Sequence, residues 1–144
     1  MPRLSQLLAK RSPVVNVFGP EQLVADAVRV MSARQVGAVL VVDAGRLVGI
    51  FSERDLLRRV VAVGRPAEKT QVGEVMTPDP VTAGPGDERA LAMLKMDQIG
   101  CRHLPIVLHG AVVDMLSIRD LVFGELEERS EAVESLRRYI GGSY

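Results

Sequence analysis

The sequence is poor in the residues on which several classes of protein depend. Its 144 residues include one cysteine, Cys101, two histidines, no tryptophan and only 3% aromatic residues. A single cysteine forms no internal disulfide, and together with two histidines it is too little for a dedicated zinc site. So few aromatic side chains also disfavour a stacking platform for single-stranded nucleic acid. We therefore expect a reducing, cytoplasmic setting and no bound cofactor or metal.

The chain also lacks an excess of charge of either sign and a long apolar run. Lys+Arg and Asp+Glu both number 18, so no surplus of positive charge is available to neutralise nucleic acid or an anionic membrane surface. No stretch approaches the roughly 20 apolar residues that cross a bilayer, and Lys10, Arg11 and Pro13 interrupt the start before a signal-peptide core forms. Nucleic acid and membranes are therefore not expected partners.

An internal repeat dominates what is present. A shift of about 65 residues aligns the segment that starts at Gly19 with the segment that starts at Gly84, without a gap. Each copy has the pattern helix, strand, turn, strand, helix. In the first copy the strands are expected at 38–42 and 47–51, followed by a helix from Ser52 to Gly64. The second copy is expected to have strands at 106–108 and 112–116 and a helix at 117–128.

These patterns predict an α+β fold of two pseudo-symmetric repeats, each a small β-sheet packed with two helices, plus a C-terminal helix. Each half is marginal in size alone, so the two should share one core. We divide the chain into a first half with an N-terminal helix (1–67), a linker (68–79), a second half (80–130) and a C-terminal helical extension (131–144). An apolar stripe near the C-terminus favours a homodimer: Leu126, Val133, Leu136, Tyr139 and Ile140.

The corner between the second strand and the second helix of each half carries a Ser-x-x-Asp pattern. In the first half, the Ser52 hydroxyl and free backbone N–H groups suit a phosphate, and the Asp55 carboxylate offers acceptors for both hydroxyls of a ribose. Gly49 leaves room for a ligand to approach the strand. The same pattern is also a capping box, in which the serine caps the helix and the acid returns a hydrogen bond. The sequence leaves both roles open.

The repeated motifs resemble the CBS domain, present as the tandem pair called a Bateman module. The resemblance rests on GIFSERD and DMLSIRD, on RHLPIV in the second copy and on VMTPDPVT at its entry, and it covers about Leu4 to Leu126. It implies a regulatory module, not an enzyme, that binds adenine nucleotides (AMP, ADP, ATP or NAD-type ligands) in clefts between the repeats and signals to an effector protein by conformational change. The alternative is a structural oligomerisation module without a ligand.

The expected ligand-binding residues fall into two groups. The polar group comes from the two motifs and the segments that enter the strands: Ser52, Arg54, Asp55, Thr82, Arg102, His103, Ser117, Arg119 and Asp120. The apolar group comes from the strands themselves: Val17, Ala38, Val39, Leu104 and Pro105. We expect Arg54 and Arg119 either to pair with phosphate or to be solvated, and His103 either to donate to a phosphate or to pack at the rim of the cleft.

The two halves differ in ways that bear on these sites. Asp114 stands where the first copy has Gly49, and its carboxylate is expected to crowd the second site and repel phosphate. The first copy has Gly37 and Ala38 in place of Arg102 and His103, so its polar lining is thinner. We therefore expect the first site to bind a nucleotide better than the second. Cys101 replaces an apolar residue of the first copy and is expected in the core.

Overall fold

Two β-hairpins form the centre of the computed structural model, which describes residues 2–126 and 130–141. Strand β2 (Ala38–Asp43) pairs antiparallel with β3 (Arg46–Ser52), and β5 (His103–Leu108) pairs in the same way with β6 (Ala111–Ser117). Each hairpin turns through two residues with positive φ, Ala44-Gly45 and His109-Gly110, as a tight two-residue hairpin turn requires. The matching turns and the matching bulge in each hairpin agree with the repeat in the sequence.

Helices precede and follow each hairpin at equivalent places. Helix α2 (Val24–Arg34) precedes the first hairpin and α5 (Arg89–Ile99) precedes the second; each ends at a left-handed residue, Gln35 or Gly100. After the first hairpin, α3 (Glu53–Asp55) continues directly into the π-helical segment η1 (Leu56–Val61). After the second hairpin, α6 (Ile118–Leu126) is regular, and α7 (Ser130–Gly141) follows it.

Short elements complete the two sheets. Strand β1 (Val17–Phe18) runs parallel to β2, and β4 (Thr77–Pro78) adds to β3, which gives a four-stranded sheet in the order β1-β2-β3-β4. Within the described part of the chain, the second sheet consists of β5 and β6, and a parallel bridge joins Ala83 to Ile106. Helix α1 (Leu4–Leu8) precedes a segment whose Val14 N–H donates to Asp114 of β6, and helix α4 (Val72–Val75) precedes β4, which pairs with β3.

The buried side chains form one core in each half and a third between the halves. The first core includes Phe51 and Val39 and takes Val72 and Val75 from α4. The second core includes Leu116 and Leu121 and takes Leu4 and Leu7 from α1. The third joins the hairpins through Ala38, Leu40, Ile50 and Met115. The two halves therefore share buried surface, as their small size requires.

The N-terminal helix α1 packs against the second half of the protein, whereas the division of the sequence placed it with the first half. We grouped α1 with the first half, but Leu4 and Leu7 pack in the second core, and the backbone N–H of Leu4 donates to the Asp87 carbonyl. The reason is that each half needs a short helix to close its core. The N-terminal segment closes the second half, and the segment between the repeats closes the first.

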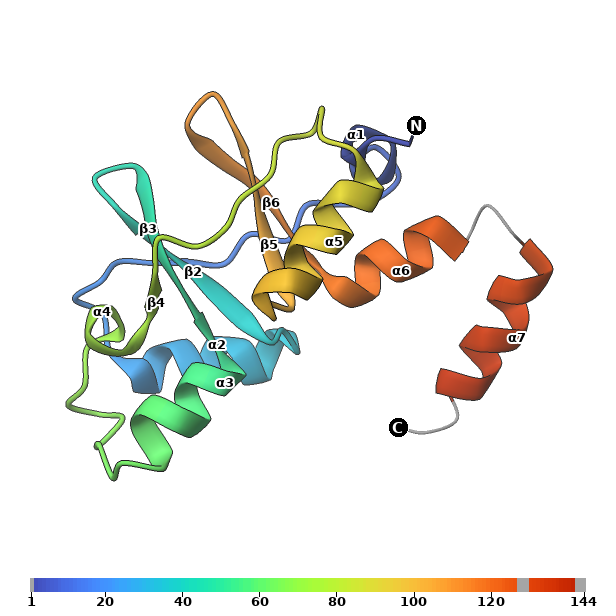
Figure 1. Ribbon diagram of the computed structural model, residues 1–144. Coiled ribbons are helices and arrows are strands. Elements are labelled where there is room, and N and C mark those ends of the chain that lie inside the picture. The colour runs from blue at the N-terminus through green and yellow to red at the C-terminus, as the bar shows by residue number, and fades with distance from the viewer. Residues whose placement is uncertain (1, 127–129, 142–144) are drawn as a thin grey trace.

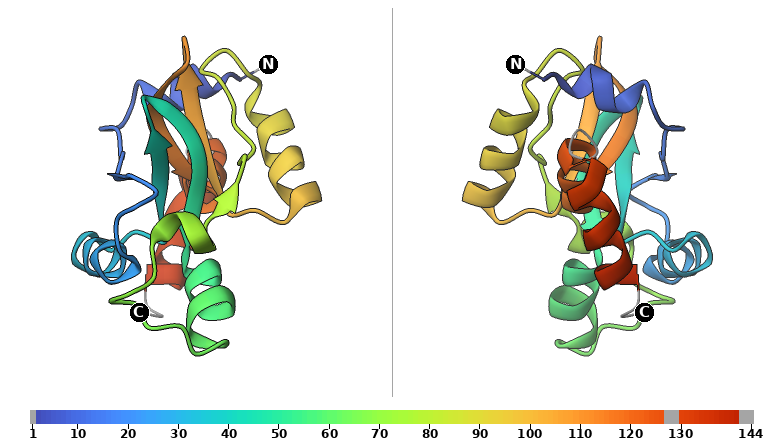
Figure 2. Two further views of the ribbon diagram at one scale, coloured as in Figure 1. Left: turned by 90° about the vertical axis from the view of Figure 1, so that its left-hand side faces the viewer. Right: turned by 90° about the vertical axis from the view of Figure 1, so that its right-hand side faces the viewer.

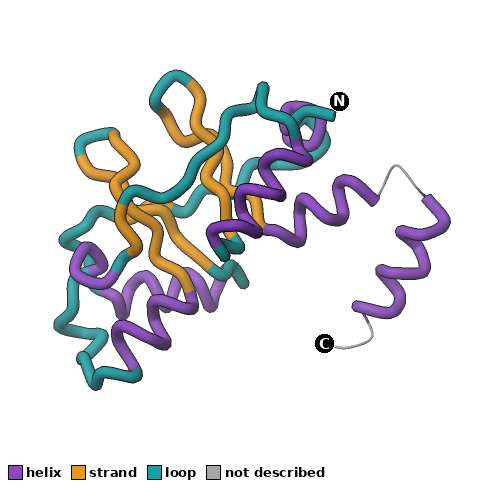
Figure 3. Tube along the Cα trace, viewed as in Figure 1, coloured by secondary structure: helices purple, strands orange, loops and turns teal. Residues whose placement is uncertain are grey.

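The overall arrangement places the helices around the two hairpins (Figure 1). Figure 2 shows α2 and α5 on opposite sides of the hairpin pair. In Figure 3 the strands occupy the middle of the molecule, whereas α6 and α7 extend from one end. This mixed architecture confirms the expected α+β class. None of the helices within the described part of the chain is long and apolar enough to span a bilayer.

Candidate functional site

A cleft opens where the end of β3 meets the segment between α5 and β5. We call it the first cleft; its volume is about 280 Å³. The first half contributes Ser52, Arg54 and Asp55, and the second half contributes Arg102 and His103. The structure therefore brings five of the predicted polar residues together from two places far apart in the sequence. The lining also includes residues that were not predicted: Gly37, Ile50, Glu53, Thr77, Ile99, Gly100 and Cys101.

The Ser52–Asp55 corner forms the capping box that the sequence allowed. The backbone N–H of Ser52 donates to Asp55 Oδ2 at 3.0 Å, and the backbone N–H of Asp55 donates to Ser52 Oγ at 3.3 Å. The Ser52 hydroxyl also donates to Asp55 Oδ2, at 3.1 Å. This arrangement fixes the carboxylate at the corner because each end of the motif satisfies the other.

Asp55 has capacity for a ligand beyond its role in the capping box. It is only 6% exposed, and its second oxygen, Oδ1, accepts from the Thr77 hydroxyl at 3.0 Å. Arg59 Nε lies 3.7 Å from the same oxygen. A carboxylate offers about four lone-pair sites, and two of the present donors are hydroxyl groups that rotate freely. Sugar hydroxyls that approach Asp55 would therefore replace donors that can turn elsewhere.

Charged groups from both halves meet at the rim of the first cleft. Arg54 Nη1 donates to the Gly100 carbonyl at 3.1 Å, so this arginine connects the two halves and is not simply solvated. Arg102 is exposed. Burial lowers the pKa of His103, while the charges of Glu53 and Asp120 oppose this and Arg102 adds to it. The imidazole of His103 is therefore neutral near pH 7 and accepts or donates a hydrogen bond without a charge.

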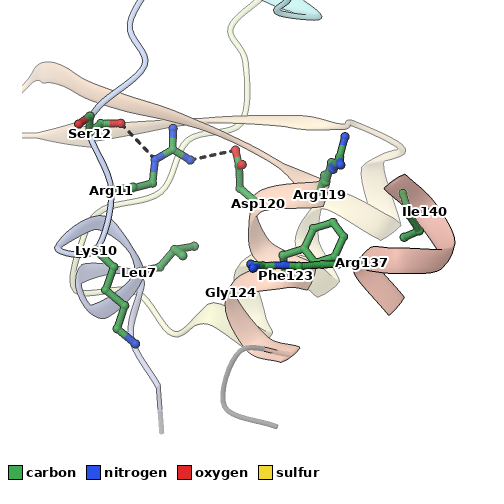
Figure 4. Close-up of a pocket in the computed structure, with 10 residues that line it drawn as sticks. All are labelled: Leu7, Lys10, Arg11, Ser12, Arg119, Asp120, Phe123, Gly124, Arg137 and Ile140. Carbon is green, nitrogen blue, oxygen red and sulfur yellow. Dashed lines mark hydrogen bonds and ion pairs between the residues drawn. The ribbon is translucent and has the colours of Figure 1, made fainter. Parts of the chain in front are cut away.

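The second cleft lies at the equivalent corner of the second half and is larger, about 640 Å³ (Figure 4). It contains the predicted residues Arg119 and Asp120, but Ser117 does not line it. The capping box recurs: the N–H of Ser117 donates to Asp120 Oδ2 at 2.8 Å, and the N–H of Asp120 donates to Ser117 Oγ at 3.1 Å. The remaining walls come from the N-terminal segment, α6 and α7.

Arg11 occupies the centre of the second corner. Its Nη1 lies 2.9 Å from Asp120 Oδ2, and its Nη2 lies 3.3 Å from Asp114 Oδ1. Burial raises the pKa of Asp120, but hydrogen bonds from Ser117 and Arg11, together with the charge of Arg11, outweigh burial and hold that pKa below its usual range. In contrast to the Thr77 hydroxyl in the first cleft, the partner of this carboxylate is a fixed cation.

The structure corrects the expectation that Asp114 itself charges and crowds the second cleft. Asp114 is 2% exposed and does not line the cleft. Its Oδ1 accepts from the N–H of Val14 at 2.9 Å and from Arg11, so the carboxylate anchors the N-terminal segment beside β6. A carboxylate that is buried and paired in this way presents little negative charge to a ligand.

Gly49 also has a different role from the one expected. A Cβ at this position would collide with the Met76 side chain and lie 3.0 Å from the Thr77 carbonyl. The glycine therefore permits β4 to pack closely against β3, where Gly49 pairs with Pro78. It does not open space for a ligand, because Met76 already fills that space.

The other predicted residues lie outside both clefts. Thr82 lines a separate shallow hollow beside the hairpin turns. Val39 and Leu104 are fully buried in the first and second cores, and Ala38 lies in the core between the halves. These side chains are buried in the cores and line neither cleft, as expected of central strands covered on both faces. Two further predicted residues lie outside the clefts: the buried Pro105 and the half-exposed Val17.

Arg11 and Thr77 were not predicted from the sequence as residues that line the clefts. A short Ser/Thr-Pro repeat just before each half would have indicated them. Ser12-Pro13 lies 65 residues before Thr77-Pro78, and the same shift of 65 residues relates the two copies. This match places Arg11 and Met76 at equivalent positions. Cys101, which we expected in the core, packs partly against the second core and also lines the first cleft. Side chains from α7 reach the second cleft only through tertiary packing, so no local pattern indicates them.

Comparison with known proteins identifies one family. The family model described as the CBS domain matches residues 6–62 and 72–126. The chain is 36% identical over 129 residues to the CBS domain-containing protein CBSX3, mitochondrial, of Arabidopsis thaliana; the match covers 86% of this chain but 63% of that protein. The chain thus spans less than two thirds of that relative.

Solved structures agree with the sequence match. A protein with CBS domains from Burkholderia ambifaria superposes with a TM-score of 0.83 at 30% identity, covering 88% of this chain and 95% of the other. A CBS domain protein from Pyrobaculum aerophilum, solved in complex with AMP, has a TM-score of 0.73 at 27% identity and covers 83% of this chain and 89% of the other. AMP is thus a ligand of a protein that shares this fold.

Proposed function

This chain belongs to the CBS-domain family, in which it is a tandem pair, and on that basis we propose that it senses an adenine nucleotide in the first cleft. CBS-domain proteins are generally regulatory or signalling modules, and we propose no catalysed reaction. The AMP complex of the Pyrobaculum relative supports this choice of ligand class. The cytoplasmic setting expected from the sequence remains part of the proposal.

The observation that carries the proposal is the position of Asp55. Its buried carboxylate faces a cleft built from both halves, and among the described residues its outer oxygen is held by the Thr77 hydroxyl and a more distant arginine. A ribose has two adjacent hydroxyl donors that suit one carboxylate. We therefore assign Asp55 to the ribose and expect the hydroxyls of Ser52 and Thr77 to turn toward the ligand.

The charges of the first cleft favour a ligand with few phosphates. Its charged lining residues are Glu53, Asp55, Arg54 and Arg102, two of each sign, beside a neutral His103. The volume of about 280 Å³ is at the lower end of small-molecule sites. We therefore propose AMP before ADP, ATP or an NAD-type ligand, with the phosphate near Arg54 and Arg102.

A signal requires that the ligand bind one arrangement of the two halves more tightly than another. Arg54 belongs to the first half and donates to Gly100 of the second, so a phosphate that recruits Arg54 competes with this connection. We propose that nucleotide binding changes the contact between the halves and that an effector protein, still to be identified, responds to it.

We also keep the homodimer as a proposal. Leu126, Leu136 and Ile140 are partly exposed, Tyr139 is 83% exposed, and Val133 has a side chain outside the described residues. A partner copy would cover this stripe across a two-fold axis.

Titration calorimetry of the full chain with AMP, adenosine and GMP tests the sensor against the alternative of a purely structural module. A sensor should bind AMP, lose affinity with adenosine because the phosphate is absent, and lose affinity with GMP because the base differs. A structural module should give no saturable heat with any of the three. AMP should also raise the melting temperature, and the rise should continue with the logarithm of the AMP concentration above the dissociation constant.

A further inference from the structure

The two Ser-x-x-Asp corners share a capping box, but different groups hold the outer side of their aspartates. In the first half, Asp55 Oδ1 accepts from the Thr77 hydroxyl at 3.0 Å, and Arg59 Nε lies farther away, at 3.7 Å. In the second half, Arg11 Nη1 lies 2.9 Å from Asp120 Oδ2. Figure 4 shows the Arg11 side chain reaching from the N-terminal segment to Asp120. A rotatable hydroxyl in one half therefore corresponds to a close cation in the other.

Arg11 is fixed at the second corner by a buried carboxylate as well as by Asp120. Its Nη2 lies 3.3 Å from Oδ1 of Asp114, a residue that is 2% exposed. The same oxygen accepts from the backbone N–H of Val14 at 2.9 Å, so the N-terminal segment is attached to β6 on both sides of Ser12. The Arg11 side chain itself is 18% exposed. A guanidinium held between two carboxylates is placed more firmly than the partner of an exposed ion pair.

The Arg11–Asp114 pair is a double departure from the internal repeat. The shift of 65 residues relates Arg11 to Met76 and Asp114 to Gly49. In the first half, the Met76 side chain packs over Gly49 and does not line the first cleft. Arg11, in contrast, lines the second cleft. The exchange therefore converts a residue that packs against a strand into one that occupies the corner.

A ribose at the second corner would have to displace Arg11. Asp120 Oδ2 already accepts from Arg11 and from the backbone N–H of Ser117, at 2.8 Å. A charge-assisted hydrogen bond is stronger than a neutral one, so a sugar hydroxyl is a weaker replacement for the guanidinium. Displacement would also leave the buried Asp114 without its cation, which is costly. At the first corner, the Thr77 hydroxyl needs only to rotate.

From this geometry we propose that Arg11 is an internal occupant of the second corner, which takes the Asp120 carboxylate that a ribose would need and closes this corner to a nucleotide. The N-terminal segment is then an autoinhibitory strap, and its release would open a second site. The chain binds a single AMP although its sequence carries the Ser-x-x-Asp motif twice. This inference rests on the proposed function for its class of ligand, but it concerns the other half.

Titration calorimetry of the full chain with AMP counts the open sites. Wild-type protein should bind one AMP. The double variant Arg11→Met with Asp114→Gly copies the apolar pair of the first half, and it should bind a second AMP roughly tenfold or more tightly than any second binding by wild type, because no charge-assisted bond has to be broken. The matched control is Arg46→Met with Asp43→Gly. It makes the same two changes at exposed residues outside both clefts and should still bind one AMP.

Two further variants make the count specific to the second corner. Asp120→Asn, added to the double variant, should return the count to that of wild type, because the charged acceptor for the second ribose is removed. Melting curves verify that each variant is folded. Should the double variant not fold, Arg11→Gln takes its place, because the neutral amide keeps a donor for Asp114 but removes the cation from Asp120.

Three outcomes would overturn the proposal: two AMP per chain in wild type, a folded Arg11 variant that binds no more AMP than wild type, or a second binding event that survives Asp120→Asn. The proposed function fails in a different way. No AMP bound by wild type and one bound by the double variant would refute the nucleotide in the first cleft and still support closure of the second corner by Arg11.

Discussion

Arg11 Nη2 lies 3.3 Å from Oδ1 of the buried Asp114, at the place in the second half where Met76 lies over Gly49 in the first. An ionic pair in one half thus corresponds to an apolar contact in the other. In each half, the pair attaches the residue just before Ser-Pro or Thr-Pro to the adjacent strand, which is β6 in the second half and β3 in the first. The exchange preserves the fold and changes the charge of the adjoining cleft.

This correspondence predicts the outcome of a double-mutant cycle. Arg11→Met alone should lower the free energy of unfolding by about 1 to 3 kcal/mol, because Asp114 stays buried without its cationic partner. The double change Arg11→Met with Asp114→Gly copies the Met76/Gly49 pair and should be more stable than the sum of the single changes implies. Chemical denaturation of the four proteins measures this. Strictly additive costs would show that the two residues do not act as a pair.

The alkylation rate of the Cys101 thiol should report whether a ligand occupies the first cleft. Burial raises the pKa of this thiol, although a backbone hydrogen bond partly opposes the rise. Alkylation should therefore be slow at neutral pH and faster as the pH rises. Because Cys101 lines the first cleft and is the sole cysteine, AMP should slow its alkylation, as followed by the mass of the intact protein. An unchanged rate in saturating AMP would place the ligand elsewhere.

His103 predicts a pH dependence of stability. Its folded-state pKa lies below the ordinary value of 6.5 because of burial, so the unfolded chain takes up a proton first as the pH falls. Its stabilising contribution is complete above about pH 6.5 and is lost as the pH falls toward the folded-state pKa. The free energy of unfolding should therefore decrease from pH 7.5 to 5.5.

A matched pair of histidine variants tests the assignment. His103→Gln should flatten the decrease, whereas His109→Asn should not, because His109 is exposed at a hairpin turn. Asp120 does not account for the effect, since its pKa is held below the usual range of a carboxylate and it titrates at lower pH. A decrease that persists in His103→Gln would show that another group is responsible.

The stripe at the C-terminal end predicts the mass in solution. Light scattering at micromolar concentration should give twice the 15.6 kDa of one chain. Tyr139→Asp places a charge on the most exposed aromatic residue of the stripe and should shift the equilibrium toward the single chain. A wild-type mass of a single chain would exclude the dimer.

The sequence was sufficient for the repeat, the hairpins and the two Ser-x-x-Asp corners, because these depend on periodicity and on local hydrogen bonds. The capping box at Ser52 and Asp55 is an example: its partners are three residues apart. Contacts between segments that are far apart in the chain could not be predicted from the sequence. Nothing local in the sequence indicates that α1 closes the second core or that Arg11 pairs with Asp114.

The differences between the expected and the observed lining of the clefts have the same physical origin. Gly49 was assigned to a ligand because a missing side chain indicates a close approach, but the approaching group is Met76 of the same chain. Val39 and Leu104 were assigned to the cleft although a strand covered on both faces buries its side chains. The Ser-x-x-Asp motif predicts where the strand-to-helix corner lies, but the packing of distant segments determines which other residues line the cleft beside it.

The decisive comparison for the nucleotide site is between Asp55→Asn and Asp120→Asn, each of which keeps the size and the capping oxygen of the carboxylate but removes its charge. Calorimetry with AMP should show a loss of roughly tenfold or more for Asp55→Asn, since a charged acceptor for the ribose is removed, and an affinity within about twofold of wild type for Asp120→Asn. Wild-type affinity in Asp55→Asn, or a greater loss in Asp120→Asn, would contradict the assignment of the nucleotide to the first cleft.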